Sequence, residues 1–184
     1  AVGLELLLLI DDPWRIYLTT DHPNGACFWR YPEIIHMLMN ADFRRDLIRK
    51  LPEKALNRIV LPELNREYTL SEIAIITSAG PARALGMPQK GHLGVGADGD
   101  VAIFNNDDNA ERMFAYPRYL IKGGVVIVEE GDIRKTIDGK ELVVRPTYDE
   151  SISDYLKPLF EQYYTMSFEN YPVEMHRIEG ADIH

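Results

Sequence analysis

The chain has 184 residues, of which 46% are hydrophobic, enough for a packed core and too many for a wholly disordered protein. Its 20 basic and 29 acidic residues give a formal net charge of −9, which argues against binding to nucleic-acid backbones or to anionic membrane surfaces. The single cysteine, Cys27, excludes an internal disulfide, a cysteine-based zinc site and an iron–sulfur cluster within this chain. We expect it to be a packed side chain in a reducing, cytoplasmic setting.

The first ten residues are apolar but too few to span a membrane. The longest apolar run, Leu6–Ile10, is far shorter than the ~20 residues that a membrane-spanning helix needs. No basic segment precedes it, so it does not have the pattern of a secretory signal. We expect residues 1–10 to be the end of a buried helix that is broken before Pro13. We also expect the chain to be a piece of a longer protein.

Residues Arg15–Thr20 are predicted to form a strand. They are rich in β-branched and aromatic side chains, and neither alternating face is strongly polar, which is typical of a parallel strand covered on both sides. Asp21 follows directly, in the polar loop 21–25. Polar side chains just past the carboxyl end of a parallel strand face the active site, because the connecting loops gather there. Asp21 is therefore a candidate metal ligand or proton-transfer group, and the alternative is that it is only a turn residue.

Two helical stretches are predicted next. Pro32 suits the first position of a helix, and apolar residues recur at helical spacing from Ile34 to Lys50, with a break near Asn40 and Asp42 as the cap of a second helix.

A capping box at Thr69 and Glu72 predicts a further helix from Leu70. Gly80-Pro81 is expected to interrupt that helix, and Gly86 to end the short turn that follows.

From Gly91 onward the pattern changes to short β-like runs, which predict antiparallel β-structure packed on the helical half. The predicted strands are residues 100–104, 119–122, 125–129 and 141–145. Gly123-Gly124 and Asp138-Gly139 are predicted as hairpin turns, because such turns need positive φ angles. An amphipathic helix is expected after Ser151, either interrupted by Pro158 or starting near Lys157, and an irregular aromatic tail follows it.

The other histidines are scattered and form no pair at metal-binding spacing. They are His36, His92, His176 and His184, and we expect each to be a surface or packing residue. The loop Gly91–Gly96 resembles a phosphate-binding loop only loosely. A strand rather than a helix is predicted after it, and no Gly-Lys-Ser/Thr follows, so nucleotide binding is excluded.

Two adjoining motifs resemble the C-terminal signature of the amidohydrolase superfamily. They are Thr77-Ser-Ala-Gly-Pro-Ala-Arg-Ala-Leu-Gly86 and Lys90-Gly-His-Leu-Gly-Val-Gly-Ala-Asp-Gly-Asp-Val-Ala-Ile-Phe104. In that superfamily a final helix of the form T-x-x-P-A-x-x-L-G leads to G-x-L-x-x-G-x-D-A-D and a strand that returns to a small β-sandwich. Gly99 stands where the superfamily often has alanine, a change that we expect to be sterically trivial.

Other segments are similar to the A subunits of formylmethanofuran dehydrogenases. They are Asp12-Pro-Trp-Arg-Ile-Tyr-Leu-Thr-Thr-Asp-His-Pro-Asn-Gly25, Arg30-Tyr-Pro32, Gly80–Gly86 and the aromatic tail. The resemblance implies an α/β plus β fold: the C-terminal part of a (β/α)8 metal-dependent hydrolase barrel, with its last strand and following helices, and antiparallel β-sandwich strands. The implied division is residues 1–88 for the barrel, 89–147 for the sandwich portion, and 148–184 for a C-terminal helix and extended tail.

The resemblance also implies a chemistry for the loop after the predicted strand. Asp21 would be the general base and acid beside a dinuclear zinc centre and would also ligate one zinc, and His22 and Asn24 would border the substrate channel. The implied reaction is condensation of formate with the amine of methanofuran, or hydrolysis of the N-formyl C–N bond, in methanogenesis from CO2. Reduction of CO2 would belong to a partner subunit with pterin-bound tungsten or molybdenum.

Most of the superfamily's metal ligands have no counterpart in this chain. Its H-x-H motif, carboxylated lysine and later histidines are absent here, and a full barrel needs ~250 residues. We expect the isolated chain to be inactive, to hold zinc sub-stoichiometrically and to self-associate through uncovered apolar faces, and the whole protein to work with other dehydrogenase subunits. Two alternatives stay open: a fragment of a dihydroorotase-like or hydantoinase-like cyclic amidohydrolase, and a non-catalytic assembly domain.

Overall fold

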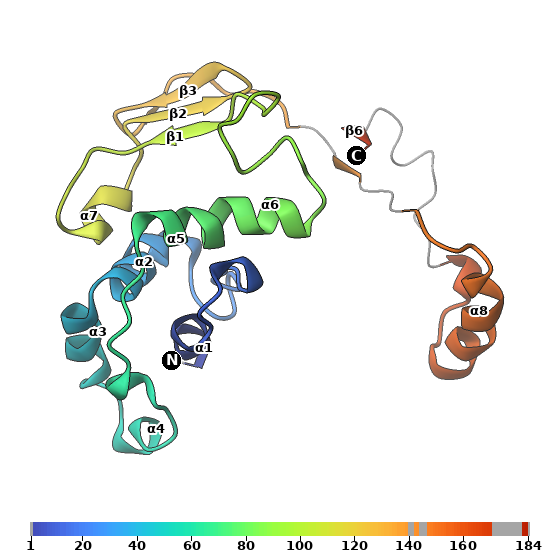
Figure 1. The fold of residues 1–184 in the computed structure, drawn as a ribbon, viewed down its shortest axis with the longest axis horizontal. Coiled ribbons are helices and arrows are strands. Elements are labelled where there is room, and N and C mark those ends of the chain that lie inside the picture. Colours follow the sequence, from blue (N-terminus) through green and yellow to red (C-terminus); the bar gives the residue numbers. More distant parts are fainter. Residues whose placement is uncertain (1, 140–141, 144–146, 171–181, 184) are drawn as a thin grey trace. The chain divides into compact units, whose positions relative to one another are not determined.

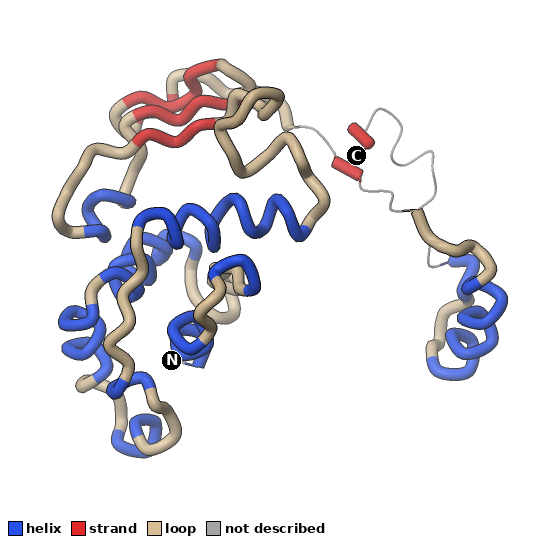
Figure 2. Tube along the Cα trace, in the orientation of Figure 1, coloured by secondary structure: helices blue, strands red, loops and turns tan. Residues whose placement is uncertain are grey.

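The structure is a computed structural model that describes residues 2–139, 142–143, 147–170 and 182–183 (Figures 1 and 2). The chain divides into two compact units, Ala1–Ile137 and Asp138–His184. The predicted division at residues 88 and 147 stays a prediction.

The first unit contains helices followed by a sheet. Its helices are α1 (Val2–Leu9), α2 (Tyr31–Met39), α3 (Ala41–Ile48), α4 (Glu53–Leu56), α5 (Leu70–Ala74), α6 (Gly80–Ala84) and α7 (Ala110–Phe114), with 3-10 turns η1 (Pro13–Arg15), η2 (Phe28–Arg30) and η3 (Leu61–Glu63) and the π-helical turn η4 (Ile75–Ala79). Its strands are β1 (Val101–Ile103), β2 (Tyr119–Lys122), β3 (Val125–Glu129) and β4 (Asp132–Ile133).

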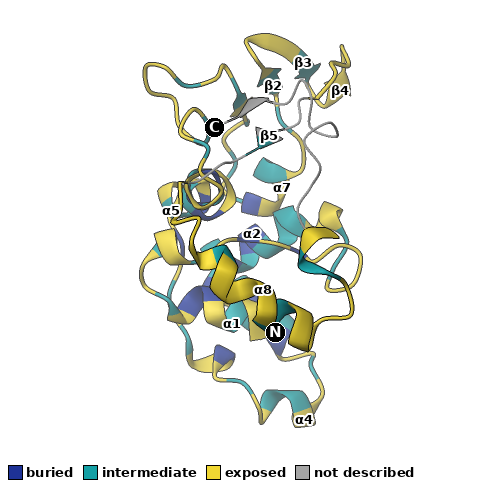
Figure 3. Ribbon diagram, turned by 90° about the vertical axis from the view of Figure 1, so that its right-hand side faces the viewer, coloured by how far each residue is buried: buried dark blue, intermediate teal, exposed yellow. Residues whose placement is uncertain are grey.

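A hydrophobic core joins the helices of this unit. Its buried members are Leu7, Leu8, Leu18, Ile35, Leu38, Ile48, Leu61, Tyr68, Ile73, Ile76 and Ala110, and Figure 3 colours buried positions dark blue. The predicted N-terminal helix is confirmed as α1, although only Leu7 and Leu8 of it are buried. The core therefore rests on α1, α2, α3, α5 and the turn that follows α5.

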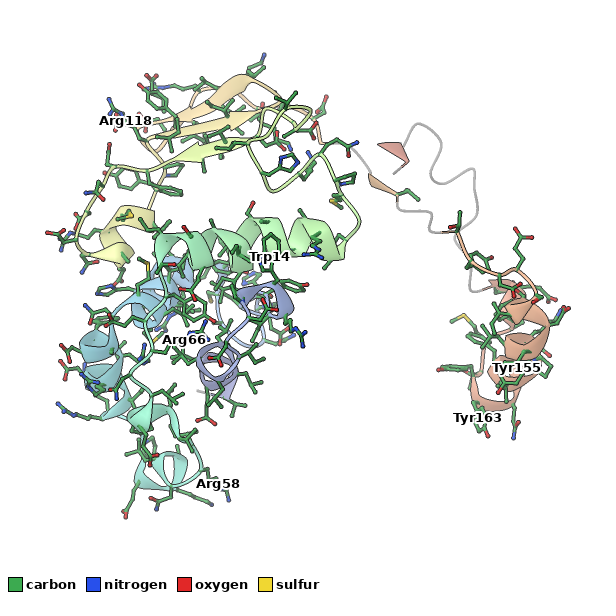
Figure 4. All side chains as sticks on the ribbon, in the orientation of Figure 1. Trp14, Arg58, Arg66, Arg118, Tyr155 and Tyr163 are labelled. Atoms are coloured by element: carbon green, nitrogen blue, oxygen red, sulfur yellow. The ribbon has the colours of Figure 1, made fainter. Side chains whose placement is uncertain are left out.

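Two arginines connect the backbone of separate helical segments. Arg44 is fully buried, and its guanidinium donates hydrogen bonds to the carbonyls of Met37 (2.6 Å), Leu64 (2.9 Å) and Arg66 (2.9 Å). Burial lowers the pKa of the Arg44 guanidinium. Arg66, labelled in Figure 4, donates to the Asp11 carbonyl at 3.2 Å and pairs with Glu72 at 3.0 Å. These bonds fix the end of α1 and the start of α5 to the same strip of chain.

The segment predicted as a strand, Arg15–Thr20, is extended but is not a strand in the described chain. Arg15 closes the turn η1, and the backbone beyond it pairs with no strand among the described residues. The Leu18 amide instead donates to the carbonyl of Ile76 at 2.9 Å. Leu18 and Thr20 are buried whereas Tyr17 and Thr19 are exposed, so only one face is covered. The physical reason is that a strand needs a hydrogen-bonded neighbour, which extended propensity alone does not supply.

The capping box that predicts a helix at Leu70 is confirmed, since Thr69 and Glu72 bond reciprocally. The predicted interruption at Gly80-Pro81 is wrong, because α5, η4 and α6 form one continuous helix from residue 70 to residue 84. Its middle is a π turn in which the Gly80 amide donates to the carbonyl of Ile75, and Pro81, which has no amide hydrogen, follows directly. Gly86, at φ 69°, ends the helix as predicted.

The break between α2 and α3 is also as predicted, but the residue that caps the start of α3 is not the predicted one. The side chain of Asn40 accepts a hydrogen bond from the Phe43 amide at 2.8 Å, whereas the predicted cap, Asp42, pairs with Arg45 on the helix surface. Asparagine and aspartate cap helices about equally well, so residue type alone did not separate the two positions.

The sheet is antiparallel, with the order β1-β2-β3-β4. The first three of these strands and the Gly123-Gly124 turn are confirmed, with φ angles of 55° and 77° at the two glycines. Strand β4 was not predicted, and it follows a second turn of the same kind at Glu130-Gly131, with φ angles of 51° and 84°. The described residues of this unit show one such sheet, and the second layer of a sandwich is not among them.

The second unit contains β5 (Leu142–Val143), α8 (Ile152–Tyr163), η5 (Phe168–Asn170) and β6 (Asp182–Ile183). Strand β5 pairs in parallel with β6, so the predicted hairpin at Asp138-Gly139 is wrong for the described part of this region. Residues 141 and 144–145 of the predicted strand lie outside the described residues. The amphipathic helix is confirmed as α8; it starts early and runs through Pro158, and Figure 4 labels its exposed Tyr155 and Tyr163.

Within the described ranges, no helix combines the length and the hydrophobicity that crossing a membrane requires.

Candidate functional site

Asp21 lies at the end of the extended segment that leads out of the core. The two residues that anchor this segment, Leu18 and Thr20, are buried, whereas Asp21 itself is exposed. Its backbone has a φ angle of 50°, a left-handed conformation that is uncommon for residues other than glycine but more accessible to aspartate than to most. The chain therefore turns sharply at Asp21 and leaves its side chain outside the core.

The loop that carries Asp21 is closed by backbone hydrogen bonds. The Gly25 amide donates to the Asp21 carbonyl at 2.9 Å, and the Ala26 amide donates to the Thr20 carbonyl at 2.8 Å. The Asp21 amide donates to the Thr19 hydroxyl at 3.2 Å. A methyl group on Gly25 would lie 2.7 Å from the Thr20 carbonyl oxygen, so only glycine allows this close approach. These contacts hold a locally unfavourable conformation in place.

Asp21 borders an open hollow of about 740 Å3 in the first unit. The walls are mainly apolar and come from α1, α2, α3, η3 and the extended segment, with Leu4, Leu7, Ile16, Leu18, Ile34, Met37, Leu47, Ile48 and Leu61 among them. Its charged groups are Asp21, Arg30 and Glu33. An apolar hollow with a few convergent polar groups is the usual form of a small-molecule site.

The carboxylate of Asp21 is available for chemistry. It has no hydrogen-bond or ion-pair partner within the part of the chain that the structure describes. Glu33, by contrast, is held by Arg30, whose Nε donates to the Glu33 carboxylate at 2.6 Å. Asp21 thus follows an extended segment and is exposed, and its predicted role as a catalytic and metal-binding residue stays a prediction.

His22 and Asn24 are not brought into this hollow. Both side chains are exposed, and neither is among the residues that line it. The His22 ring instead contacts Phe28 and Trp29, with ring centroids 5.2 and 6.4 Å apart. Sequence reasoning also missed Arg30 and Glu33 as lining residues, although their i, i+3 spacing at the start of a helix is typical of an ion pair.

The remaining histidines do not form a metal site with Asp21. Within the described ranges there is no group of three or more His, Cys, Asp or Glu side chains placed to hold a metal ion. His36 is buried against Phe43, with ring centroids 4.2 Å apart, and His92 bonds to the Pro88 carbonyl at 2.8 Å. Both are packing or loop residues, as predicted, whereas His176 and His184 lie outside the described residues.

A second aspartate, Asp100, has the opposite surroundings. Its carboxylate accepts hydrogen bonds from Lys90 at 2.9 Å, from the Gly123 amide at 2.8 Å and from Lys122. Burial alone would raise the pKa of the Asp100 carboxyl, but the bonds from Lys122, Lys90 and Gly123 outweigh it and hold that pKa well below its ordinary value. The same contacts raise the pKa of Lys90, through its bonds to Asp98 and Asp100. This cluster attaches the loop before β1 to the β2–β3 turn.

The expectation that Gly99 is sterically trivial is wrong. A methyl group there would lie 2.7 Å from the Gly124 amide nitrogen and 3.1 Å from the Gly124 Cα. The Gly124 amide donates to the Gly99 carbonyl at 2.9 Å, so the two backbones are in direct contact. A larger residue at this position requires the turn to shift.

The comparisons with known proteins agree with one another. Residues 4–128 match the model of the Amidohydrolase family. Over 142 residues the chain is 47% identical to the A subunit of the Formyltransferase/hydrolase complex Fhc of Methylorubrum extorquens, a match that covers 77% of this chain and 26% of that protein. Over 185 residues it is 40% identical to Protein FwdA of Methanocaldococcus jannaschii, covering 94% of this chain and 32% of that protein.

One solved structure is similar over the whole chain. It is the crystal structure of the formyltransferase/hydrolase complex (FhcABCD) from Methylorubrum extorquens in complex with methylofuran, with a TM-score of 0.79 and 37% identity. The match covers 100% of this chain and 34% of that chain. The chain thus spans about a quarter to a third of the length of the proteins it matches.

Proposed function

This chain belongs to the amidohydrolase family, and from that premise we propose that it is part of a formylmethanofuran dehydrogenase A-type subunit, which forms or hydrolyses an N-formyl C–N bond. The support is the identity of 40% to FwdA and of 47% to the Fhc A subunit, together with a free carboxylate on an apolar hollow. Because those proteins are three to four times longer than the matched region, the activity is proposed for the whole protein.

The extended segment Ile16–Thr20 is the proposed last strand of a (β/α)8 barrel in the whole protein. Three observations support this: the segment is extended, one of its faces is buried, and its edges find no strand partner within the described residues. Neighbouring strands from the rest of the protein would pair with it and cover the apolar hollow. In the same proposal residues 1–88 belong to the barrel, residues 89–147 to the sandwich portion and residues 148–184 to a C-terminal helix and tail.

The proposed role of Asp21 is proton transfer. As a water oxygen attacks the formyl carbon of the substrate, the Asp21 carboxylate takes a proton from that water. It then gives the proton to the substrate nitrogen as the C–N bond breaks, so that formate and the free amine leave. Condensation of formate with the amine is the same sequence in reverse. The observation that carries this role is the unpaired carboxylate of Asp21 at the hollow's edge.

The described residues of this chain do not fit a dinuclear zinc centre, because they contain no group of three or more His, Cys, Asp or Glu side chains placed to hold a metal ion. We propose that zinc belongs to the whole protein, that Asp21 contributes one ligand, and that the others come from outside this chain. The isolated chain is then inactive and holds less than one zinc per chain. Elemental analysis of the purified chain tests this, and two tightly held zinc ions per chain would contradict it.

The proposal extends to substrate and partners. The amine would be methanofuran or a related furan, His22 and Asn24 would border the channel by which it enters, and formate would come from another subunit of the complex. This part of the proposal rests on the names of the relatives, one of which was solved with methylofuran in a complex of several subunits. The same proposal includes a role in methanogenesis, a cytoplasmic location, self-association of the isolated chain and a partner subunit with tungsten or molybdenum.

A panel of substrates tests the proposed activity against its alternatives. The whole protein that contains this chain is incubated with N-formylfurfurylamine, dihydroorotate and hydantoin, and release of formate or ring opening is measured. We expect formate release from the formamide alone, and its loss in Asp21→Asn. Ring opening of the cyclic amides instead would favour a cyclic amidohydrolase. No turnover of any of them by the zinc-loaded protein would favour a non-catalytic assembly domain.

A further inference from the structure

Within the described chain, the place of the Asp21 carboxylate is set by its backbone. The carboxylate has no hydrogen-bond or ion-pair partner there, so no side chain holds it. Its backbone has a φ angle of 50°, which is unfavourable for residues other than glycine and persists only where other contacts hold it. The contacts that hold the backbone at Asp21 therefore decide where its carboxylate lies.

All four backbone polar groups of Thr20 and Asp21 have hydrogen-bond partners. Three of these bonds, at 2.8, 2.9 and 3.2 Å, come from residues inside the loop 21–25 or directly beside it. In the fourth, the Thr20 amide donates to the Tyr31 hydroxyl at 3.3 Å. Tyr31 is the first residue of α2, so this bond connects the loop to a helix of the core.

Both partners of this fourth bond are held by the fold. The Tyr31 ring is partly buried and packs against the hydrophobic core, and its amide donates to the Phe28 carbonyl. Farther along α2, Ile35 and Leu38 are buried in the same core. Thr20 is buried as well. The Tyr31 oxygen is thus a fixed acceptor, directly before the residue at which the chain turns.

We propose that Tyr31 is a positioning residue, whose hydroxyl fixes the backbone that presents the Asp21 carboxylate to the hollow. This inference rests on the proposed function, in which Asp21 transfers the proton. A proton acceptor has to lie within hydrogen-bond reach of the attacking water, and a misplacement of about 1 Å can cost roughly a hundredfold in rate. Tyr31 is not among the described residues that line the hollow, and it takes no part in proton transfer.

Hydrogen exchange tests the positioning without any turnover. In the whole protein, Tyr31→Phe removes the hydroxyl and keeps the ring, and the exchange of peptides that span residues 18–26 is followed by mass spectrometry. We expect the amides of Gly25 and Ala26, which close the loop, to exchange about tenfold faster than in the wild type. Unchanged exchange of these two amides overturns the inference.

The matched control is Tyr68→Phe. Tyr68 is buried, and its hydroxyl also bonds to a backbone group, the carbonyl of Leu7. Losing that bond leaves a buried carbonyl without its donor, so we expect the melting temperature to fall at least as far as in Tyr31→Phe. Exchange of the loop amides should stay at the wild-type rate. Equally faster exchange in the two variants would show general loosening of the protein and overturn the inference.

Kinetics test whether the hydroxyl acts through Asp21. In Tyr31→Phe we expect kcat for N-formylfurfurylamine hydrolysis to fall about tenfold with KM nearly unchanged, because the lining of the hollow is kept. Tyr68→Phe should change neither quantity. In a protein that already contains Asp21→Asn, adding Tyr31→Phe should cause no further loss of kcat, since the group that it positions is gone. Equal losses of kcat with and without Asp21 would overturn the inference.

The tests separate failure of this inference from failure of the proposed function. Faster loop exchange in Tyr31→Phe alone, in a protein that hydrolyses no formamide, supports the anchoring of the loop by Tyr31 and contradicts the proposed catalysis. Formamide hydrolysis in which Tyr31→Phe changes neither kcat nor loop exchange supports the catalysis and overturns the positioning role. Faster loop exchange with an unchanged kcat would show that the anchored loop does not place Asp21 for the reaction, and it also overturns that role.

Discussion

Asp21 and Asp100 are both aspartates in tightly turned loops, yet their surroundings are opposite. Asp100 has two lysines and a backbone amide on its carboxylate, and these hold its pKa low. Asp21 has a left-handed backbone and no side-chain partner within the described chain. The paired carboxylate joins segments of the fold, whereas the free one costs the fold some local strain and stays available to a ligand.

The difference shows how the surroundings of a carboxylate separate one that is used by the fold from one that is left without a partner in the described chain. Each loop contains a glycine whose added methyl group would lie 2.7 Å from a backbone atom, Gly25 beside Asp21 and Gly99 beside Asp100. The close backbone approach is therefore common to both loops and does not distinguish Asp21 from Asp100. What discriminates is whether the carboxylate's hydrogen-bonding capacity is used, because a satisfied carboxylate is a poor proton acceptor.

The largest expected effect is on turnover in Asp21→Asn. An amide of the same shape cannot accept the proton, so we expect the formamide hydrolysis rate of the whole protein to fall about a thousandfold. Because no described side chain pairs with Asp21, the melting temperature of the variant protein should differ from that of the wild type by less than about two degrees, as judged by calorimetry. Asp138→Asn, at an exposed position in the second unit, is the control and should alter neither quantity. A large loss of stability in Asp21→Asn would place this residue with Asp100 as structural.

The next effect is on stability in Asp100→Asn. The amide loses the charge that Lys90 and Lys122 contact, so we expect the free energy of unfolding to fall by about 2 kcal/mol in a denaturant titration. The control is Asp108→Asn, at an exposed neighbouring position, which should cost less than about 0.5 kcal/mol. Equal losses in the two variants would mean that the Asp100 cluster adds nothing beyond an ordinary surface charge.

Features set by neighbours in the chain were predicted well. The capping box at Thr69, the strands β1 to β3 and the turn at Gly123-Gly124 all depend on a few adjacent residues, and the structure has each of them. Features set by distant contacts were not. The segment Arg15–Thr20 has the composition of a strand, but pairing depends on partners that no local pattern encodes.

The residues that line the candidate site also fall into those indicated by local sequence and those that depend on distant contacts. Asp21 was chosen as a candidate because it follows an extended apolar run, which is a local signal, and its role stays a prediction. Arg30 and Glu33 were missed, because what makes them part of the hollow is the packing of α1, α2 and α3 around it.

The turn at Glu130-Gly131, in the sheet, was missed for a third reason, since glutamate is not a residue that usually signals a positive φ angle.

A smaller effect is expected in Gly25→Ala, which tests whether the Asp21 loop needs its close approach. The added methyl group meets the Thr20 carbonyl oxygen at 2.7 Å, so we expect a loss of about 1.5 kcal/mol in the free energy of unfolding together with weaker formamide hydrolysis. Gly139→Ala is the matched control, because a methyl group there meets nothing within 4 Å. If Gly25→Ala keeps full activity and stability, the loop conformation does not fix Asp21.

The smallest effect concerns pH and isolates the charge of Asp100. Its pKa is lowered in the folded state from an ordinary value of 3.8, so its contribution is fully present above that value and is lost as pH falls towards the folded pKa. At about 1.4 kcal/mol per pH unit, the stability gap between the wild type and Asp100→Asn should shrink by about 1 kcal/mol at pH 3. The gap is measured by paired denaturant titrations at pH 7 and pH 3. A stability gap that is the same at pH 7 and pH 3 would mean that the contacts from Lys90 and Lys122 do not stabilise the charged carboxylate of Asp100.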